Sequence, residues 1–297
     1  MTFSHTGELA AAATAISWAV SATLFDQVSK RAGTFAVNTI KVCYALIFIS
    51  IYLATTGTEL FPLSVPFSGW IWLSLSGLTG FIIGDLFLFQ AFIILGARIS
   101  MVIYALAPAM TAFGGYLLFG EKLSIVSAGG MTLTLSGIIL VVLARPGTDS
   151  SQRRIRTTGV IYAFLATVCQ AAGYLMSKQG LLVVAPVRAT QIRLIAAVAG
   201  FIIMMSVTKR TASTAGILKD RYVSPRLLIA SFFGPFFGVA LSMYAIGNAK
   251  AGIASAIISM TPVILIIPAV LILKEKVTFR EVLGAVLAVS GNLLFFM

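Results

Sequence analysis

Residues 108–137 read PAMTAFGGYLLFGEKLSIVSAGGMTLTLSG, and residues 262–291 read PVILIIPAVLILKEKVTFREVLGAVLAVSG. In each stretch a proline is followed thirteen residues later by Glu-Lys, and fifteen residues after that by Ser-Gly. Every member of the second set lies 154 positions after its partner. A spacing of polar and proline residues kept over this length predicts an internal duplication, which determines the architecture of the chain.

The duplication extends outward from these two stretches. Toward the start of each half the shift becomes 152, which aligns Lys41 with Arg193. We therefore expect a first repeat at 1–144, a polar linker at 145–157 and a second repeat at 158–297. At the shift of 154, two Gly-xxx-Gly pairs also match, namely Gly80 and Gly84 with Gly234 and Gly238.

The composition is that of a membrane protein. Hydrophobic residues make up 59% of the chain and charged residues 10%, against roughly 45–50% and about 25% in soluble proteins. A membrane helix needs about 20 apolar residues. Ten segments meet this requirement, at 8–27, 35–55, 69–94, 98–119, 124–144, 158–178, 188–207, 226–247, 251–273 and 278–296.

The predicted fold is all-α, with ten transmembrane helices in two five-helix repeats. Because five is odd, the second repeat starts on the opposite side of the membrane and is inverted relative to the first. Two similar halves in opposite orientations can pack in two related ways, one open to each side. This arrangement is the structural basis of alternating access.

The net charge of +12 does not predict nucleic-acid binding, because Lys and Arg are scattered over short loops, where lipid headgroups are their expected partners. Loops on one side of the predicted topology hold 15 of these residues and loops on the other hold 4. The positive-inside rule then places both termini outside. A single histidine, His5, and two cysteines in apolar runs, Cys43 and Cys169, predict no metal site, cofactor or disulfide framework.

Ionisable residues inside the bilayer give the sharpest indication of a site. A central Asp, Lys or Arg costs roughly 2.5–3.5 kcal/mol on insertion scales. Lys41 and Asp85 approach from the same side and are predicted to pair, with Asp85 as an ion-pair partner or a proton-binding group. The position matched to Asp85 in the second repeat is Val239, which leaves Arg193 without an equivalent partner. Arg193 is therefore a candidate to capture a substrate carboxylate, although snorkelling or pairing with Glu8 is an alternative.

Aromatic and polar residues inside the predicted spans suggest a binding cavity. Trp18, Tyr104 and Tyr174 lie within helices, and Gln170 occupies the position matched to Trp18. A partly aromatic cavity with a few polar groups suits a small amphipathic solute. Ordinary helix packing is the competing interpretation of each residue.

Glycine and proline predict where the helices approach each other and bend. The Gly-xxx-Gly pairs favour close helix packing, or the lining of a cavity with backbone. Pro108 and Pro262 predict a bend in each half, either a fixed kink or a hinge. The Glu-Lys pairs are predicted to mark tight turns, and Thr278 with Glu281 forms a capping box at the start of the last helix.

The ten spans, the Gly120-Glu121-Lys122 turn with Ser136-Gly137, and their copies in the second half resemble the EamA-type branch of the drug/metabolite transporter superfamily. Within that branch the chain is most similar to YddG-type aromatic amino-acid exporters. The resemblance implies export of aromatic and other neutral amino acids, such as methionine or threonine, by a multi-pass protein of the inner (plasma) membrane. It also implies cytoplasmic termini, contrary to the loop charges.

Several alternatives stay open. The same superfamily includes antiporters of sugar phosphates or nucleotide sugars, which need several converging cations, and exporters of other small metabolites or drugs. An enzyme is not expected, since the sequence supplies neither a nucleophile with a base nor a metal cluster. A channel fits the inverted halves less well. The sequence leaves the oligomeric state open and is compatible with a monomer.

Overall fold

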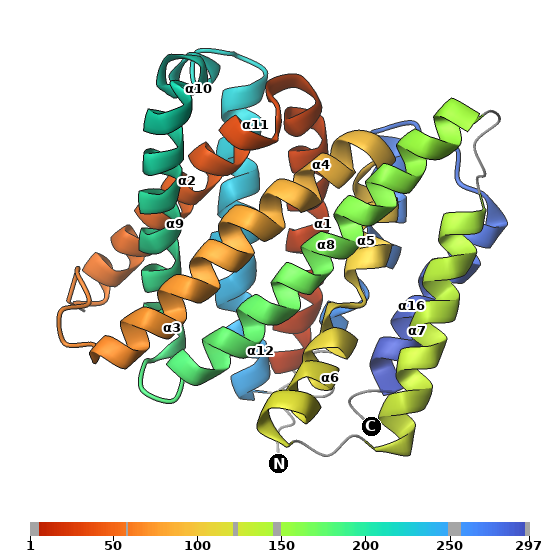
Figure 1. Cartoon of the computed structure of the whole chain (residues 1–297), viewed down its shortest axis with the longest axis horizontal. Coiled ribbons are helices and arrows are strands. Elements are labelled where there is room, and N and C mark those ends of the chain that lie inside the picture. The colour runs from red at the N-terminus through yellow and green to blue at the C-terminus, as the bar shows by residue number, and fades with distance from the viewer. Residues whose placement is uncertain (1–5, 58, 121–123, 145–149, 249–256, 295–297) are drawn as a thin grey trace.

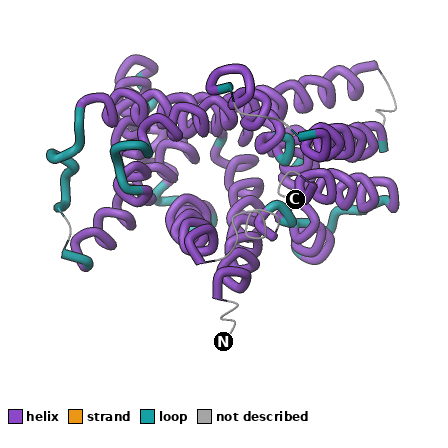
Figure 2. Tube along the Cα trace, turned by 90° about the horizontal axis from the view of Figure 1, so that it is seen from below, coloured by secondary structure: helices purple, strands orange, loops and turns teal. Residues whose placement is uncertain are grey.

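The computed structural model of the chain describes residues 6–57, 59–120, 124–144, 150–248 and 257–294. Within these ranges the chain is helical, with connecting loops and no strand (Figure 2). The helices, numbered as in Figure 1, are α1 (Thr6–Ala32), α2 (Thr34–Thr55), α3 (Phe67–Gly77), η1 (Leu78–Gly84), α4 (Asp85–Leu95), α5 (Ala97–Tyr104), α6 (Ala107–Phe119), α7 (Ile125–Leu143), α8 (Ser150–Gly180), α9 (Pro186–Thr208), α10 (Thr211–Ile217), α11 (Val223–Ser231), η2 (Phe232–Gly238), α12 (Val239–Asn248), α14 (Thr261–Ile264), α15 (Ile266–Leu271) and α16 (Phe279–Leu294).

Length and composition allow seven of the described helices to cross a membrane. They are Thr6–Ala32, Thr34–Thr55, Phe67–Leu95, Ala97–Phe119, Ser151–Gly180, Pro186–Thr208 and Val223–Ser242. Shorter apolar helices lie at Ala128–Leu143 and Thr261–Leu271. Helix occupies part of each of the ten predicted segments. Ten spans in two repeats nevertheless remain a prediction, because not every one of these helices is long enough by itself.

Helix α1 lies inside the bundle, behind α4 and α8 in Figure 1, and packs on α4, α11, η2 and α12. Its small residues Ala11, Ala15 and Ala19 are almost completely buried. Small side chains let neighbouring backbones approach closely, which is how helices associate where lipid offers no hydrophobic driving force. The acidic Glu8 in its first turn and the basic Lys30 and Arg31 in its last turn complement the helix dipole.

Two π-helical segments, η1 and η2, interrupt the long helices α3–α4 and α11–α12 at positions 154 residues apart. Proline at 235 lies inside η2 and has no N–H to donate. Ser21 Oγ of α1 instead donates to the Ala230 carbonyl oxygen, at 3.0 Å, and Ser17 Oγ donates to the Phe233 carbonyl oxygen, at 2.6 Å. The interrupted backbone is thus satisfied by side chains from the neighbouring helix.

The Gly-xxx-Gly pairs lie within these π segments, where they meet other helices. A Cβ atom at Gly234 would overlap Ser21 Oγ, and one at Gly238 would overlap the Trp18 indole. A Cβ atom at Gly84 would lie 3.1 Å from Cys169 Cβ. These glycines therefore let α1 and α8 approach the interrupted helices.

Pro108 and Pro262 stand at helix starts rather than in helix interiors. Pro108 follows a break at Ala105 and Leu106 and lies in the first turn of α6, and Pro262 lies in the first turn of α14. Proline is compatible with a first turn because its missing N–H would have no partner there. The predicted bend in the first half is therefore a short interruption between two helices.

The segments that connect the helices are partly described. The Glu121-Lys122 turn lies outside the described residues, as do 145–149 of the predicted linker and the start of the predicted segment 251–273. The other part of the predicted linker is helical, because α8 begins at Ser150. In the second half the chain passes through Lys274 with a left-handed φ of 53° and reaches Glu275.

The Ser-Gly motifs pair α7 with α16, which lie side by side (Figure 1). A Cβ atom at Gly137 would overlap the backbone of Gly284 and Ala288, and one at Gly291 would overlap Thr134 and the Gly130 carbonyl. Thr134 Oγ1 also donates to the Ala288 carbonyl oxygen, at 3.2 Å. The glycine at each motif is required for this contact because any larger residue would separate the two helices.

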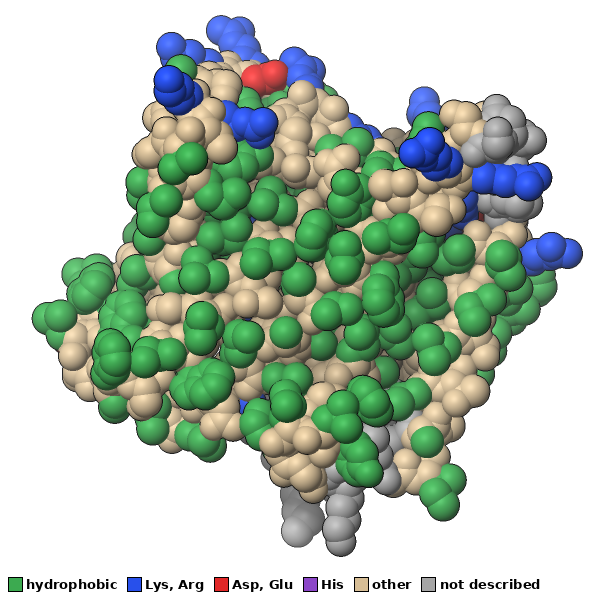
Figure 3. All heavy atoms as spheres, viewed as in Figure 1, with side chains coloured by type: hydrophobic (Ala, Val, Ile, Leu, Met, Phe, Trp, Pro, Cys, Tyr) green, Lys and Arg blue, Asp and Glu red, His purple; other side chains and the backbone are tan. Residues whose placement is uncertain are grey.

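Basic side chains gather at one end of the molecule. Figure 3 shows Lys and Arg side chains around the end that carries α10 and around the start of α8, while the face between them and the opposite end is largely hydrophobic. On the face that Figure 3 shows, the charge asymmetry counted along the sequence therefore corresponds to an asymmetry in space. Which end faces the cytoplasm stays a prediction.

Candidate functional site

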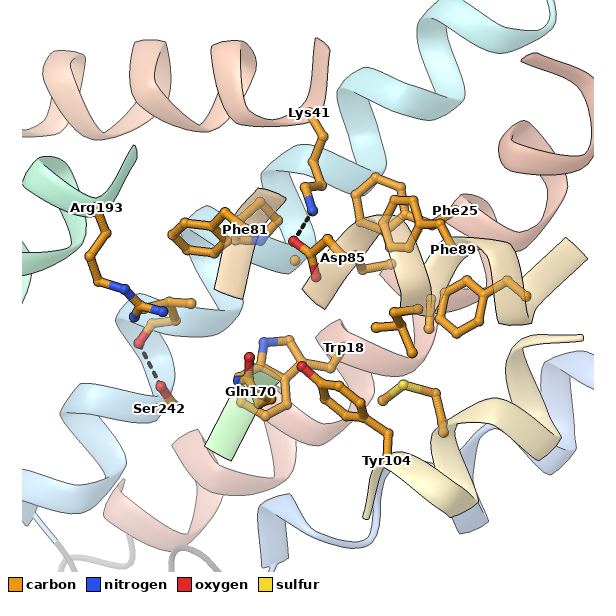
Figure 4. A pocket seen from close by; sticks show the side chains of 18 of the residues that line it. Trp18, Phe25, Lys41, Phe81, Asp85, Phe89, Tyr104, Gln170, Arg193 and Ser242 are labelled. Atoms are coloured by element: carbon orange, nitrogen blue, oxygen red, sulfur yellow. Dashed lines mark hydrogen bonds and ion pairs between the residues drawn. The ribbon is translucent and has the colours of Figure 1, made fainter. Parts of the chain in front are cut away.

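A cavity of about 240 Å³ lies among α1, α2, α8, α9 and the two interrupted helices. All seven residues predicted as binding or ion-pair groups line it, namely Trp18, Lys41, Asp85, Tyr104, Gln170, Tyr174 and Arg193. Figure 4 labels six of them, all except Tyr174, and they come from separate segments of the chain. Its volume is slightly smaller than the roughly 300–1,000 Å³ usual for ligand pockets, which suits a small solute.

Aromatic rings that the sequence analysis did not select complete the wall. Phe81, Asp85, Phe89 and Phe92 follow at steps of three or four along η1 and α4 and line the cavity together, with Phe25 from α1. This periodicity was available as a signal, since such positions share a helix face. It was obscured because 21 phenylalanines are distributed over the whole chain.

Lys41 and Asp85 form a buried ion pair through Lys41 Nζ and Asp85 Oδ2. The Lys41 side chain is 4% exposed, so it does not snorkel to the surface. Its ammonium group lies 4.7 Å from the Phe89 ring centroid, within the range of a cation–π contact. Asn38 Nδ2 donates to the Asp85 main-chain oxygen at 3.2 Å, so α2 fixes both the backbone and the carboxylate of Asp85.

Arg193 has a different environment. Its Nε atom is buried and has no hydrogen-bond partner, and among the described residues no carboxylate lies within ion-pair distance of the guanidinium group. The proposed alternative partner, Glu8, is therefore not paired with it. The guanidinium carbon lies 4.7 Å from the Phe81 ring centroid, a second cation–π contact.

Close helix packing holds Arg193 in place. A Cβ atom at Gly77 would overlap the Arg193 carbonyl group, so α3 and α9 touch at this residue. At Gly80 a Cβ atom would lie 3.4 Å from Arg193 Nη2 and 3.9 Å from Gln170 Oε1. The absence of a side chain at 80 therefore leaves room beside the guanidinium group and the amide.

The remaining predicted residues form the other wall. Trp18, Gln170 and Tyr104 lie together in Figure 4, from α1, α8 and α5. Tyr174 lies one helical turn after Gln170 and is 40% exposed. The cavity thus combines aromatic surface with one uncompensated cation, one ion pair and an amide.

Sequence reasoning missed a second set of charges, around Arg98 at the start of α5. Arg98 is 3% exposed and donates to Glu275 at 3.1 Å and to Glu281 at 3.4 Å. Glu281 also accepts from the Thr278 main-chain N–H at 2.7 Å, while Thr278 Oγ1 accepts from the Glu281 N–H at 3.4 Å, so the predicted capping box is confirmed. Glu275, interpreted as a turn marker, is therefore also a partner of a buried arginine from the first half.

Asp26 at the end of α1 belongs to the same region. Its buried carboxylate accepts from Lys30 Nζ at 2.7 Å and from the main-chain N–H of Ala97 at 3.1 Å. Gly96, with a left-handed φ of 82°, turns the chain from α4 into α5 and so presents this N–H group. None of these residues lines the cavity, and in the described part of the chain no His, Cys, Asp and Glu side chains are grouped as metal ligands.

Apolar helices of membrane-spanning length around a polar, aromatic cavity define a multi-pass membrane protein. The profile of the EamA-like transporter family matches residues 5–143 and again residues 157–297. The chain belongs to this family, which comprises membrane transporters of small solutes.

The chain is also similar to one protein in sequence and to one solved structure in fold. It is 24% identical over 278 residues to a WAT1-related, chloroplastic protein of Arabidopsis thaliana, covering 90% of this chain and 64% of that protein. The chain thus spans less than two thirds of that relative's length. A solved structure described only as the crystal structure of a protein aligns with a TM-score of 0.63 at 17% identity, covering 97% of this chain and 95% of the other. At that identity the likeness concerns the fold alone.

Proposed function

We propose that the protein is a secondary transporter that exports aromatic and other neutral amino acids across the inner (plasma) membrane by alternating access. The substrate side chain would rest against Trp18, Tyr104 and Tyr174, and its carboxylate would meet Arg193. Membership of the EamA-like family supports transport of a small solute. The choice of an amino acid comes from the resemblance to YddG-type exporters, and the aromatic and charged side chains of the cavity are compatible with it.

The observation that carries this proposal is the unpaired Arg193. A buried guanidinium group without a carboxylate is costly, and such intramembrane charges are usually retained for function. Planar guanidinium groups bind carboxylates through two parallel hydrogen bonds. Arg193 lines the cavity, so its guanidinium group would meet the carboxylate of a solute bound there.

The proposed alternating access is based on two halves that are inverted repeats of five spans each. Three observations support this arrangement. The family profile matches twice, and the two π segments are 154 residues apart. The contacts between α7 and α16 are also reciprocal: Gly137 meets Gly284 and Ala288, and Gly291, 154 positions after Gly137, meets the matched residues Gly130 and Thr134. Such reciprocity is what a twofold relation between the halves would produce.

The inversion can be tested with cysteines at matched exposed positions. In a chain without Cys43 and Cys169, we expect Glu59→Cys and Ser213→Cys to react with an impermeant thiol reagent from opposite faces of the membrane. By the positive-inside rule, Ser213 would face the cytoplasm and both termini the outside. Labelling of both cysteines from one face would contradict inverted repeats.

The substrate is tested in proteoliposomes with tryptophan, phenylalanine, methionine and threonine against sugar phosphates. We expect saturable, counterflow-capable transport of the amino acids, which separates a carrier from a channel. Arg193→Ala should lose at least tenfold in apparent affinity, since a charge-assisted hydrogen bond contributes about 1.5–3 kcal/mol. Unchanged kinetics would remove Arg193 from the site.

A sugar-phosphate or nucleotide-sugar antiporter is the second candidate. Anions of that kind need several converging cations, but Asp85 already neutralises one of the two cations that line this cavity. Exporters of other metabolites or drugs form a third class. Accumulation of sugar phosphates but not amino acids in the same liposomes would favour the antiporter.

A further inference from the structure

We propose that Asp85 is the receptor for the ammonium group of the transported solute, so that the cavity selects zwitterions over anions and over cations. This inference rests on the proposed amino-acid transport. It adds a second recognition point to the carboxylate site at Arg193 and gives Asp85 a role beyond its ion pair with Lys41.

One oxygen atom of the Asp85 carboxylate can still accept hydrogen bonds. Oδ2 holds Lys41 Nζ, whereas Oδ1 has no hydrogen-bond partner among the described residues. The Asp85 side chain is 14% exposed and lines the cavity. In Figure 4 it lies between Lys41 and the group formed by Trp18, Gln170 and Tyr104. A carboxylate accepts about four hydrogen bonds, so it can hold a second ammonium group without releasing the first.

Asp85 and Arg193 are arranged around one aromatic ring. Phe81 in η1 precedes Asp85 by four residues, and both side chains line the cavity. The Phe81 ring also lies under the Arg193 guanidinium group, at 4.7 Å. Arg193 and Asp85 both line the cavity, so it offers a cation for the carboxylate and a carboxylate for the ammonium group of an α-amino acid.

The charge balance explains the selectivity. Lys41 and Asp85 together are neutral, which leaves the single positive charge of Arg193 in the cavity. A carboxylic acid without an amino group would pair with Arg193 but bring its charge toward Asp85. An amine without a carboxylate would meet Asp85 but leave Arg193 desolvated and unpaired. A zwitterion alone satisfies both sites, since like charges held close in a low-dielectric cavity repel strongly.

Three ligands of similar size test the inference: L-phenylalanine, 3-phenylpropionate, which lacks the amino group, and 2-phenylethylamine, which lacks the carboxylate. Their binding to the purified full-length chain in detergent is measured by equilibrium dialysis, which does not depend on transport. We expect the wild type to bind phenylalanine at least tenfold more tightly than either analogue.

A variant that removes the Asp85 charge must also remove the Lys41 charge, because Lys41 pairs with Asp85. Asp85→Asn alone leaves a buried ammonium group and can fail to fold, so the informative variant is Asp85→Asn with Lys41→Met, which removes both charges. We expect this double variant to bind phenylalanine and 3-phenylpropionate within threefold of each other. Removal of the exposed pair Arg31–Asp220 by Arg31→Met with Asp220→Asn is the matched control and should leave the wild-type ratio intact.

The possible results separate this inference from the proposed function. If the wild type binds 3-phenylpropionate as tightly as phenylalanine, or the Asp85/Lys41 double variant keeps the full preference for phenylalanine, Asp85 is not the ammonium receptor, although Arg193 can still capture a carboxylate. Failure of the wild type to bind phenylalanine would overturn amino-acid transport itself, and the inference with it.

Discussion

Arg98 and Arg193 are both arginines embedded in an apolar bundle, but their environments are opposite. Arg98 is paired with two carboxylates from the second half, one of them completely buried. Arg193 faces a cavity and has an unpartnered Nε. A desolvated charge that is fully paired stabilises a particular packing, whereas one left unpaired costs stability unless a ligand supplies the missing charge. The comparison assigns Arg98 to the scaffold and Arg193 to the site.

The largest expected effect concerns Arg98. Arg98→Met removes the buried cation that Glu275 and Glu281 both contact and should lower the free energy of unfolding by about 3–5 kcal/mol. Thermal unfolding in detergent measures the loss. A triple variant with Glu275→Gln and Glu281→Gln should recover most of it, because no charge is then left alone. Equal stability of Arg98→Met and the wild type would contradict the assignment of Arg98 to the scaffold.

The α7–α16 contact tests whether the scaffold also depends on close backbone packing. Gly137→Ala places a Cβ atom in the backbone of α16 and should cost about 1–3 kcal/mol in unfolding free energy. Gly129, on the same helix, has open space around it and serves as a control. Gly129→Ala should stabilise the chain by about 0.5–1 kcal/mol through helix propensity. If Gly137→Ala stabilised the chain as Gly129→Ala is expected to do, the α7–α16 contact would not contribute to stability.

A smaller effect is expected at Lys274, which adopts a left-handed φ immediately before the Arg98 partner Glu275. Gly120 holds the equivalent left-handed conformation 154 residues earlier. Lys274→Gly should raise the unfolding free energy by about 1 kcal/mol, because glycine adopts this conformation without strain. A drop in melting temperature would show that the lysine side chain contributes more than its backbone costs.

The smallest effect on stability should come from Gly80, on the cavity side. Gly80→Ala places a methyl group 3.4 Å from Arg193 Nη2, which a flexible side chain can accommodate. Melting temperature should stay within about 2–4 °C of the wild type, which corresponds to less than about 1 kcal/mol. The apparent affinity for amino acids should nevertheless fall severalfold in proteoliposomes. Unchanged affinity would place the substrate elsewhere in the cavity.

Some of this arrangement could be predicted from the sequence, for a physical reason. Ionisable residues inside apolar segments cost free energy on insertion, so Lys41, Asp85 and Arg193 could be selected for that reason alone. In the structure all three line one cavity. Asp85 and Lys41 could be matched because both approach from the same side. Trp18 was selected because it lies inside an apolar span, and Gln170 because it occupies the position matched to Trp18 in the second half.

The rest depends on contacts between distant segments. Arg98 and Glu275 each lie at the end of a predicted span, where a charge that faces water is ordinary, so nothing local indicated that they would be buried together. The π segments were hidden because a backbone hydrogen-bond register leaves little trace in composition. Pro235 gave a hint in the second half only, and the first half has no equivalent residue.

The central claim is that Arg193 is kept unpaired for the carboxylate of a solute. The most direct measurement is the shift in melting temperature that L-phenylalanine causes in the wild type and in Arg193→Gln. The account predicts that the ligand stabilises the wild type, that the variant alone is at least as stable as the ligand-free wild type, and that its melting temperature does not respond to phenylalanine. An equal ligand-induced shift in both proteins would contradict it.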